Sequence, residues 1–160
     1  MNRKVELSEE NYDLDEVIHQ LCEQGRLLEE QNAMQHGSTS VYEHSVNVAY
    51  KSLLLVENYR LPVDKQSLVR GALLHDYFLY DWHEKDGGHR LHGFRHPAFA
   101  LYNASKDFSL NRKERNIIAR HMFPLTVLPP RCLEAWIVCF VDKYCAFSET
   151  MGDGRIQWER

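Results

Sequence analysis

The sequence predicts an all-α protein, a compact single-domain bundle of about six helices. Apolar residues recur at three- and four-residue spacing along most of the chain, and helix-capping residues precede several of these segments. No segment of strand length alternates apolar and polar residues. The 160 residues suit one domain. We expect it to span 1–160, with a motif-bearing core at about 41–146, a polar N-terminal segment at 1–11 and a C-terminal tail at 151–160.

The first three helices are expected in the N-terminal half of the chain. Apolar residues at helical spacing predict one from Leu14 to about Glu30, and the segment "HGSTS" follows as a break. A second helix begins near Val41, where an apolar stripe resumes. Pro62 ends the next linker, and Asp64 is suited to cap a third helix that continues through "KQSLVRGALLHDYFLY".

Three more helices are expected after a Gly-rich loop, "EKDGGHRLHG". His96 and Pro97 have the pattern of an N-cap and first helical residue opening the helix "PAFALYNAS". Asn111 and Glu114 stand three apart, as in a capping box, before "RNIIARHM". Prolines then break the chain, and a last helix runs from about Arg131 to Glu149, before "GDG".

Composition argues against several classes of protein. The net charge of −4 gives no basic footprint for nucleic acid. The longest apolar runs are too short to span a bilayer, and the polar start lacks the apolar segment of a signal peptide. Four cysteines lie in apolar segments without a CxxC pair, which is typical of reduced thiols. We therefore expect a cytoplasmic protein with no membrane partner; a homo-oligomer is possible, but nothing in the sequence indicates one.

Nine histidines are the unusual feature of the composition, and several polar residues fall on helix faces otherwise built for the core. These are His44, the adjacent pair His75 and Asp76, His121, and Asp142 within "WIVCFVDKYCAF". A single residue of this kind is more often a satisfied core or cap residue. Five of them on four helices change that interpretation, because buried carboxylates are costly unless something pairs with them.

A divalent metal ion is the natural shared partner for these five side chains. Imidazole nitrogens and carboxylate oxygens are ligands of Zn, Mn, Fe, Co and Ni. Gly71 and Ala72, one turn before His75 and Asp76, would leave room for something beside the pair. The alternative is a buried ion-pair network with protonated histidines.

The order of these residues resembles the H…HD…D signature of the HD-domain metal-dependent phosphohydrolase superfamily. His44 lies in "SVYEHSVNVA", His75 and Asp76 lie in "GALLHDYF", and Asp142 lies in "FVDKY". Each segment is similar to the family helix that carries the corresponding residue. The resemblance covers most of the chain and implies an all-helical, metal-dependent fold.

Two further histidines refine the resemblance: His96 in "RHPAFA" and His121 in "IARHM". Dinuclear members of the family place two histidines between the His-Asp pair and the last aspartate. The resemblance thus implies two divalent metal ions, drawn from Fe, Mn, Zn, Co and Ni. The first would be held by His44, His75, Asp76 and Asp142, and the second by His96 and His121 with Asp76 bridging.

The resemblance also implies an activity. It points to hydrolysis of a phosphomonoester or phosphodiester, such as a nucleotide, by metal-activated water, with His75 and Asp76 at the catalytic centre. Many family members carry a lysine or arginine three residues after the aspartate, where this chain has Leu79. Phosphate binding by that position is therefore not carried over. The candidate substrate-binding residues are Arg95, His92, Lys143 and His36.

Two other functions stay open at this point. A metal-stabilised helical module without catalytic activity would bind a nucleotide or a protein partner. A di-iron oxygenase of the HD type would use the same histidine-rich centre for redox chemistry. Metal content, turnover of phosphate esters and oxygen consumption distinguish the three possibilities.

Overall fold

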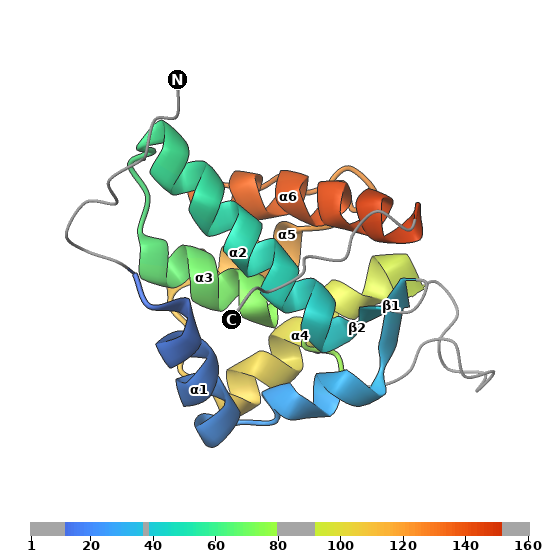
Figure 1. Cartoon of the computed structure of the whole chain (residues 1–160). Coiled ribbons are helices and arrows are strands. Elements are labelled where there is room, and N and C mark those ends of the chain that lie inside the picture. The colour runs from blue at the N-terminus through green and yellow to red at the C-terminus, as the bar shows by residue number, and fades with distance from the viewer. Residues whose placement is uncertain (1–11, 37–38, 80–91, 152–160) are drawn as a thin grey trace.

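The computed structural model describes residues 12–36, 39–79 and 92–151. The polar N-terminal segment, almost all of the C-terminal tail and most of the expected Gly-rich loop lie outside these residues. The predicted all-α fold is confirmed (Figure 1). The elements are α1 (Leu14–Gln24), a 3₁₀ helix η1 (Leu27–Asn32), β1 (Met34–His36), β2 (Thr39–Ser40), α2 (Val41–Tyr59), α3 (Lys65–Leu74), α4 (His92–Asp107), α5 (Arg112–Arg120) and α6 (Leu133–Thr150).

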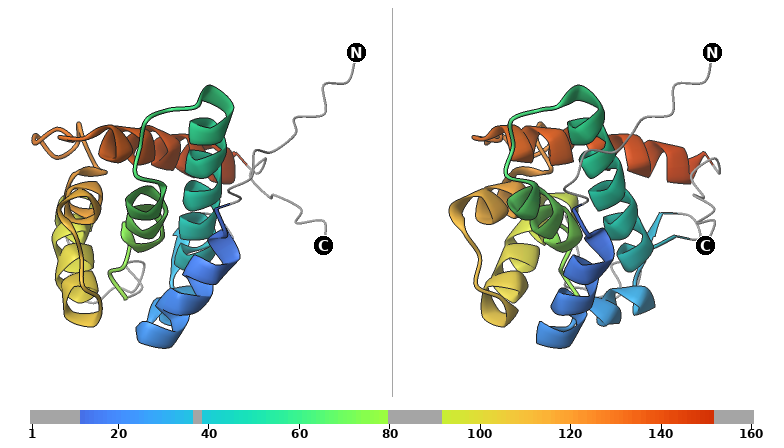
Figure 2. Two further views of the ribbon diagram at one scale, coloured as in Figure 1. Left: turned by 90° about the vertical axis from the view of Figure 1, so that its left-hand side faces the viewer. Right: turned by 60° about the vertical axis from the view of Figure 1, so that its left-hand side comes forward.

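Helix α3 lies at the centre of the bundle. It packs between α2 on one side and α5 on the other, while α6 crosses above them and contacts all three (Figures 1 and 2). Helix α4 packs against α5, and α1 packs against α3. No helix in the described residues is long and apolar enough to cross a membrane.

Two of the predicted caps have the expected geometry, and a third cap, at α2, was not predicted. Asp64 accepts a hydrogen bond from the Ser67 backbone N–H at 3.0 Å and opens α3. Asn111 and Glu114 form the predicted capping box at α5. Ser40 and Glu43 form a second capping box, which opens α2 one turn before His44. These local hydrogen bonds fix where the helices that carry the site begin.

The first predicted helix is wrong in its extent. It ends at Gln24, and Leu27–Asn32 form a separate 3₁₀ helix. The break falls at Gly25, where the ring of Phe108 approaches so closely that an added Cβ would lie 2.3 Å from its Cζ. Only glycine fits there, so the chain turns away from α1 against the end of α4.

Helix α3 ends at Leu74, before the predicted end at Tyr80, and leaves His75 and Asp76 in a turn. Neither glycine nor proline marks this end in the sequence. The side-chain amide of Asn103 on α4 donates to the backbone carbonyls of Tyr77 and Phe78, at 3.2 and 3.1 Å. Leu79 then adopts a left-handed conformation with φ of 57°. Tertiary contacts, not local signals, end this helix.

The room expected at Gly71, one turn before His75, is filled. Gly71 faces Ile117 of α5, and a Cβ at Gly71 would lie 2.4 Å from its Cδ1 and 3.0 Å from its Cβ. Ile117 is fully buried. The small residue therefore serves close packing of α3 on α5 and leaves no space for a ligand.

Helix α4 begins at His92, one turn earlier than predicted, so His96 is not an N-cap and Pro97 lies inside the helix. Because proline has no N–H group, the helix forgoes one intrahelical hydrogen bond at Pro97. The earlier start makes His96 a helical residue whose position is set by the packing of α4.

Two short antiparallel strands, β1 and β2, were not predicted. They pair Met34 with Ser40 and His36 with Thr39 just before α2. Strands of three and two residues are too short to show a period-two pattern.

The cysteines at 22, 132, 139 and 145 are all free thiols.

Candidate metal centre

Six polar side chains converge in the interior from five parts of the fold. Each is at most 7% exposed, although the helices that supply them start far apart in sequence. They are His44 on α2, His75 and Asp76 in the turn after α3, His96 on α4, His121 at the end of α5 and Asp142 on α6. The fold thus brings together all six residues that the resemblance implied as metal ligands.

The first group of ligand atoms comes from His44, His75, Asp76 and Asp142. His44 Nε2 lies 3.0 Å from Asp142 Oδ1 and 3.9 Å from Asp76 Oδ2. His75 Nε2 lies 3.3 Å from Asp76 Oδ2 and 3.5 Å from Asp142 Oδ1. Atoms that each bind one ion at about 2.1 Å stand roughly 3 Å apart, so this group fits a single metal ion.

The second group comes from Asp76, His96 and His121. The two Nε2 atoms of His96 and His121 lie 2.8 Å apart. Asp76 Oδ1 lies 3.1 Å from the first and 3.3 Å from the second. Three atoms with lone pairs therefore surround one point, at separations that suit a second ion.

Asp76 belongs to both groups through different oxygens. Its Oδ2 faces His44 and His75, and its Oδ1 faces His96 and His121. A carboxylate oriented in this way can bridge two cations a few Å apart.

Backbone carbonyls fix which ring nitrogen is available in two of the histidines. His75 Nδ1 donates to the Ala72 carbonyl at 2.6 Å, and His121 Nδ1 donates to the Ile118 carbonyl at 2.9 Å. This selects the tautomer whose Nε2 carries the lone pair. His75 Nε2 is buried and forms no well-oriented hydrogen bond within the described residues. A buried acceptor in this situation is costly, and a metal ion would satisfy it.

Burial and the neighbouring charges shift the pKa values of these groups in opposite directions. Burial alone would raise the pKa of Asp76, but interactions with His75, His96 and His121 hold it well below its usual value. The pKa of Asp142 is lowered in the same way by His44 and His75. Burial lowers the pKa of His121, which favours the neutral imidazole that binds metal.

Glu149 orients His44 from behind and was missed in the sequence. His44 Nδ1 lies 2.8 Å from Glu149 Oε2, and the Asn47 side-chain amide donates to Glu149 Oε1 at 3.1 Å. Burial would lower the pKa of His44, but hydrogen bonds with Asp142 and Glu149 raise it to about 9. Glu149 follows Asp142 by seven residues, two helical turns, and that spacing was the available signal.

We expect Glu149→Gln to weaken metal binding by about 10- to 100-fold, because carboxylate partners of ligand histidines have effects of this size. A chelator competition assay measures the dissociation constant. Glu23→Gln, an exposed position on α1, is the matched control. An affinity within threefold of wild type would show that Glu149 does not support His44.

A second buried carboxyl group, Glu30 on η1, was also missed. It is fully buried, and neither of its oxygens has a hydrogen-bond partner among the described residues. Burial, together with the negative charge of Asp76, raises its pKa well above the usual value. Glu30 is therefore a carboxylic acid that retains its proton far more readily than an exposed glutamate.

This shift predicts how Glu30→Gln changes stability with pH. Above the pKa of Glu30 in the unfolded chain, unfolding releases its proton, and this lowers the free energy of unfolding of the wild type as pH rises. Glutamine cannot ionise, so the variant lacks this loss. We expect the metal-free variant to gain stability over wild type as pH rises from 5 to 8, by about 1.4 kcal/mol for each unit of pKa difference. Urea unfolding at pH 5, 6.5 and 8 measures the trend. A stability difference that stays constant with pH would contradict it.

The four candidate substrate-binding residues have different surroundings. Arg95 is exposed, and it lies on α4 instead of the expected loop. The Lys143 ammonium donates to the His121 carbonyl at 2.7 Å and so ties α6 to the end of α5. The backbones of His36 and His92 lie at the end of β1 and the start of α4, and their side chains are outside the described residues.

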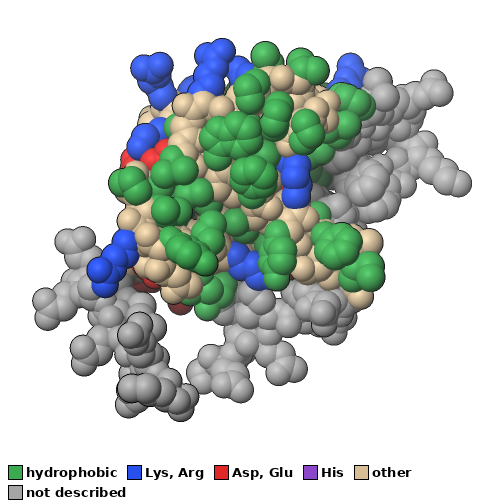
Figure 3. All heavy atoms as spheres, turned by 90° about the horizontal axis from the view of Figure 1, so that it is seen from above, with side chains coloured by type: hydrophobic (Ala, Val, Ile, Leu, Met, Phe, Trp, Pro, Cys, Tyr) green, Lys and Arg blue, Asp and Glu red, His purple; other side chains and the backbone are tan. Residues whose placement is uncertain are grey.

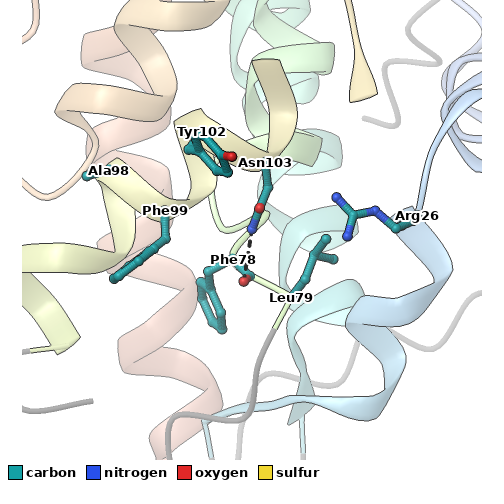
Figure 4. A pocket seen from close by; sticks show the side chains of 7 residues that line it. All are labelled: Arg26, Phe78, Leu79, Ala98, Phe99, Tyr102 and Asn103. Atoms are coloured by element: carbon teal, nitrogen blue, oxygen red, sulfur yellow. Dashed lines mark hydrogen bonds between the residues drawn. The ribbon is translucent and has the colours of Figure 1, made fainter. Parts of the chain in front are cut away.

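A pocket of about 600 Å³ lies between the backbone after α3 and one face of α4 (Figure 4). It shares a wall with the second group of ligands, because the ring of Phe78 lines the pocket and lies edge-on to the His96 ring, 5.7 Å between centroids. Most of the lining is apolar or aromatic, with one guanidinium at its edge. The lining residues are Arg26, Phe78, Leu79, Ala98, Phe99, Tyr102 and Asn103.

Comparison with known proteins gives one match. The sequence model of the HD domain family matches residues 41–146, a span that includes all six converging side chains. Neither a curated protein nor a solved structure matches the chain.

Proposed function

This chain belongs to the HD domain family, and on that basis we propose that it is a metal-dependent phosphohydrolase acting on a phosphomonoester or phosphodiester. One observation carries the proposal. Two groups of buried ligand atoms share Asp76, with one carboxylate oxygen toward each group. A two-metal centre of this kind suits hydrolysis of a phosphate ester, because charge develops on both the attacking and the leaving oxygen.

We propose that His44, His75, Asp76 and Asp142 hold one divalent ion, and that His96 and His121 with Asp76 hold a second. Such a pair supplies bound water of lowered pKa and positive charge for the phosphate oxygens. Four imidazoles favour Fe, Mn, Zn, Co or Ni over Mg or Ca. His75 and Asp76 are the proposed catalytic residues, since the turn after α3 positions both of them at the junction of the two groups.

A small phosphorylated molecule is the proposed substrate, and a nucleotide is the class that we favour. The pocket behind Phe78 offers aromatic side chains to a base or another ring. Arg95, exposed on the helix that also carries His96, is the proposed phosphate contact, because guanidinium groups bind phosphate in a bidentate manner.

The first experiment measures metal content per chain in wild type and in His96→Ala. We expect about two ions in wild type and about one in the variant, because only the second group loses a ligand. His19→Ala, at an exposed position on α1, is the control and should keep both ions. If the protein binds no metal even after reconstitution with Mn, Fe and Zn, the proposal is overturned. The six side chains would then form a buried ion-pair network instead.

The second experiment assays the loaded protein on aryl phosphates, aryl phosphodiesters and nucleotides. Release of phosphate or alcohol that disappears with chelator supports the hydrolase. Two bound ions without turnover on any of these esters would favour a non-enzymatic binding module. Two iron ions with oxygen consumption and no hydrolysis would favour an oxygenase.

A further inference from the structure

The outer face of α6 carries a stripe of exposed apolar side chains. They range from 42% to 69% exposed, which is high for large apolar residues. Hydrophobic side chains gather on the side of the molecule where α6 lies, and few acidic side chains interrupt them (Figure 3). We name as the α6 stripe the residues Leu133, Phe140, Tyr144, Phe147 and Met151.

The α6 stripe has the spacing of a seam between two helices. Phe140 follows Leu133 by seven residues, and Tyr144, Phe147 and Met151 then follow at intervals of four, three and four. That 3.5-residue repeat is how helices associate with partners of the same pattern. The metal ligand Asp142 and its neighbour Glu149 point to the opposite, buried side of α6. One face of α6 therefore contributes to the candidate metal centre, and the other is exposed among the described residues.

From this arrangement we infer that the α6 stripe is the interface of a homodimer, in which α6 packs against α6 of a second copy. The five side chains of the stripe are uncharged, and the Lys51 ammonium lies over the Tyr144 ring, 4.8 Å from its centroid. A two-fold interface requires one self-complementary surface, and an uncharged apolar stripe along a helix satisfies that requirement.

The area of the α6 stripe is sufficient for such a dimer. A large apolar side chain offers about 200 Å², so the exposed fractions of the five residues correspond to roughly 600 Å² per copy. Two copies would bury about 1,200 Å², the lower end of the range for specific interfaces.

The test is sedimentation equilibrium of the full metal-loaded chain, from about 1 to 100 µM, a range that detects micromolar dissociation constants. We expect wild type at twice the 18.9 kDa mass of the chain, and Phe140→Glu and Phe147→Glu as monomers with association weakened at least 100-fold. Tyr102→Glu, equally exposed but on α4, is the matched control and should dimerise as wild type does.

Circular dichroism and metal content keep the test interpretable. Both should match wild type in the two variants, because the replaced side chains are exposed. A wild-type monomer at 100 µM would overturn the inference. The same result is expected if another part of the same chain covers the stripe. A dimer that survives both substitutions would overturn it as well, since another face would then form the contact.

Discussion

Replacing Asp76 with asparagine is expected to abolish metal binding at both positions and to reduce hydrolysis at least 1,000-fold. The two oxygens of this carboxylate face the two groups of ligand atoms, so the substitution removes a ligand and a negative charge from each. No other side chain of the centre belongs to both groups. The measurements are metal per chain by mass spectrometry and hydrolysis rate with saturating metal.

The Asp76→Asn result needs a structural control and a chemical one. Asp15→Asn changes an exposed carboxylate in the first turn of α1 and should retain metal and activity. His96→Ala should retain one ion, which distinguishes loss of the bridging carboxylate from loss of a single group. If Asp76→Asn still bound two ions, the bridging role of Asp76 would be wrong.

The second large effect is on stability. Replacing glycine by alanine inside a helix ordinarily stabilises a protein by about 0.5–1 kcal/mol. At Gly71 we expect the opposite, a loss of about 1–3 kcal/mol, because the new Cβ would lie 2.4 Å from Ile117 Cδ1 and 3.0 Å from Ile117 Cβ in a close-packed core. The free energy of unfolding in urea measures the loss.

A second substitution identifies the cause of that loss. Ile117→Val removes the Cδ1 methyl group and should by itself cost about 0.5–1.5 kcal/mol. Combined with Gly71→Ala, it should restore part of the lost stability, so that the double variant is more stable than the sum of the single effects. Simple additivity would show that the α3–α5 contact is not the source.

Five of the six candidate ligands were predictable because each is a polar residue on an apolar helix face, whereas His96 was found only through the family resemblance. His44 and Asp142 are polar residues on apolar helix faces, and both are buried as that placement implies. Glu149 escaped notice because a glutamate in the last turn of a helix is ordinarily solvated. Glu30 escaped notice because its burial depends on the break after α1, which the apolar periodicity does not reveal.

The limits of the fold prediction have a common physical origin. Helix starts were predictable where a side chain caps its own backbone, as at Asp64 and Asn111. The ends of α1 and α3 were not, because they depend on residues distant in sequence, whereas α6 ends within one residue of the predicted Glu149. Phe108 forces the break at Gly25, and Asn103 holds the backbone after α3.

The separation of the ligands along the chain has a consequence for the lifetime of the protein. His44 and Asp142 stand 98 residues apart, so the unfolded chain does not hold the ligand set together. Metal that binds only the folded state stabilises it by about 2.7 kcal/mol at 100 times the dissociation constant. Proteases attack the transiently opened chain, so the rate of degradation rises when this stabilisation is lost. We therefore expect metal starvation to shorten the half-life of the wild-type protein and to leave that of Asp76→Asn unchanged, which a pulse-chase experiment measures.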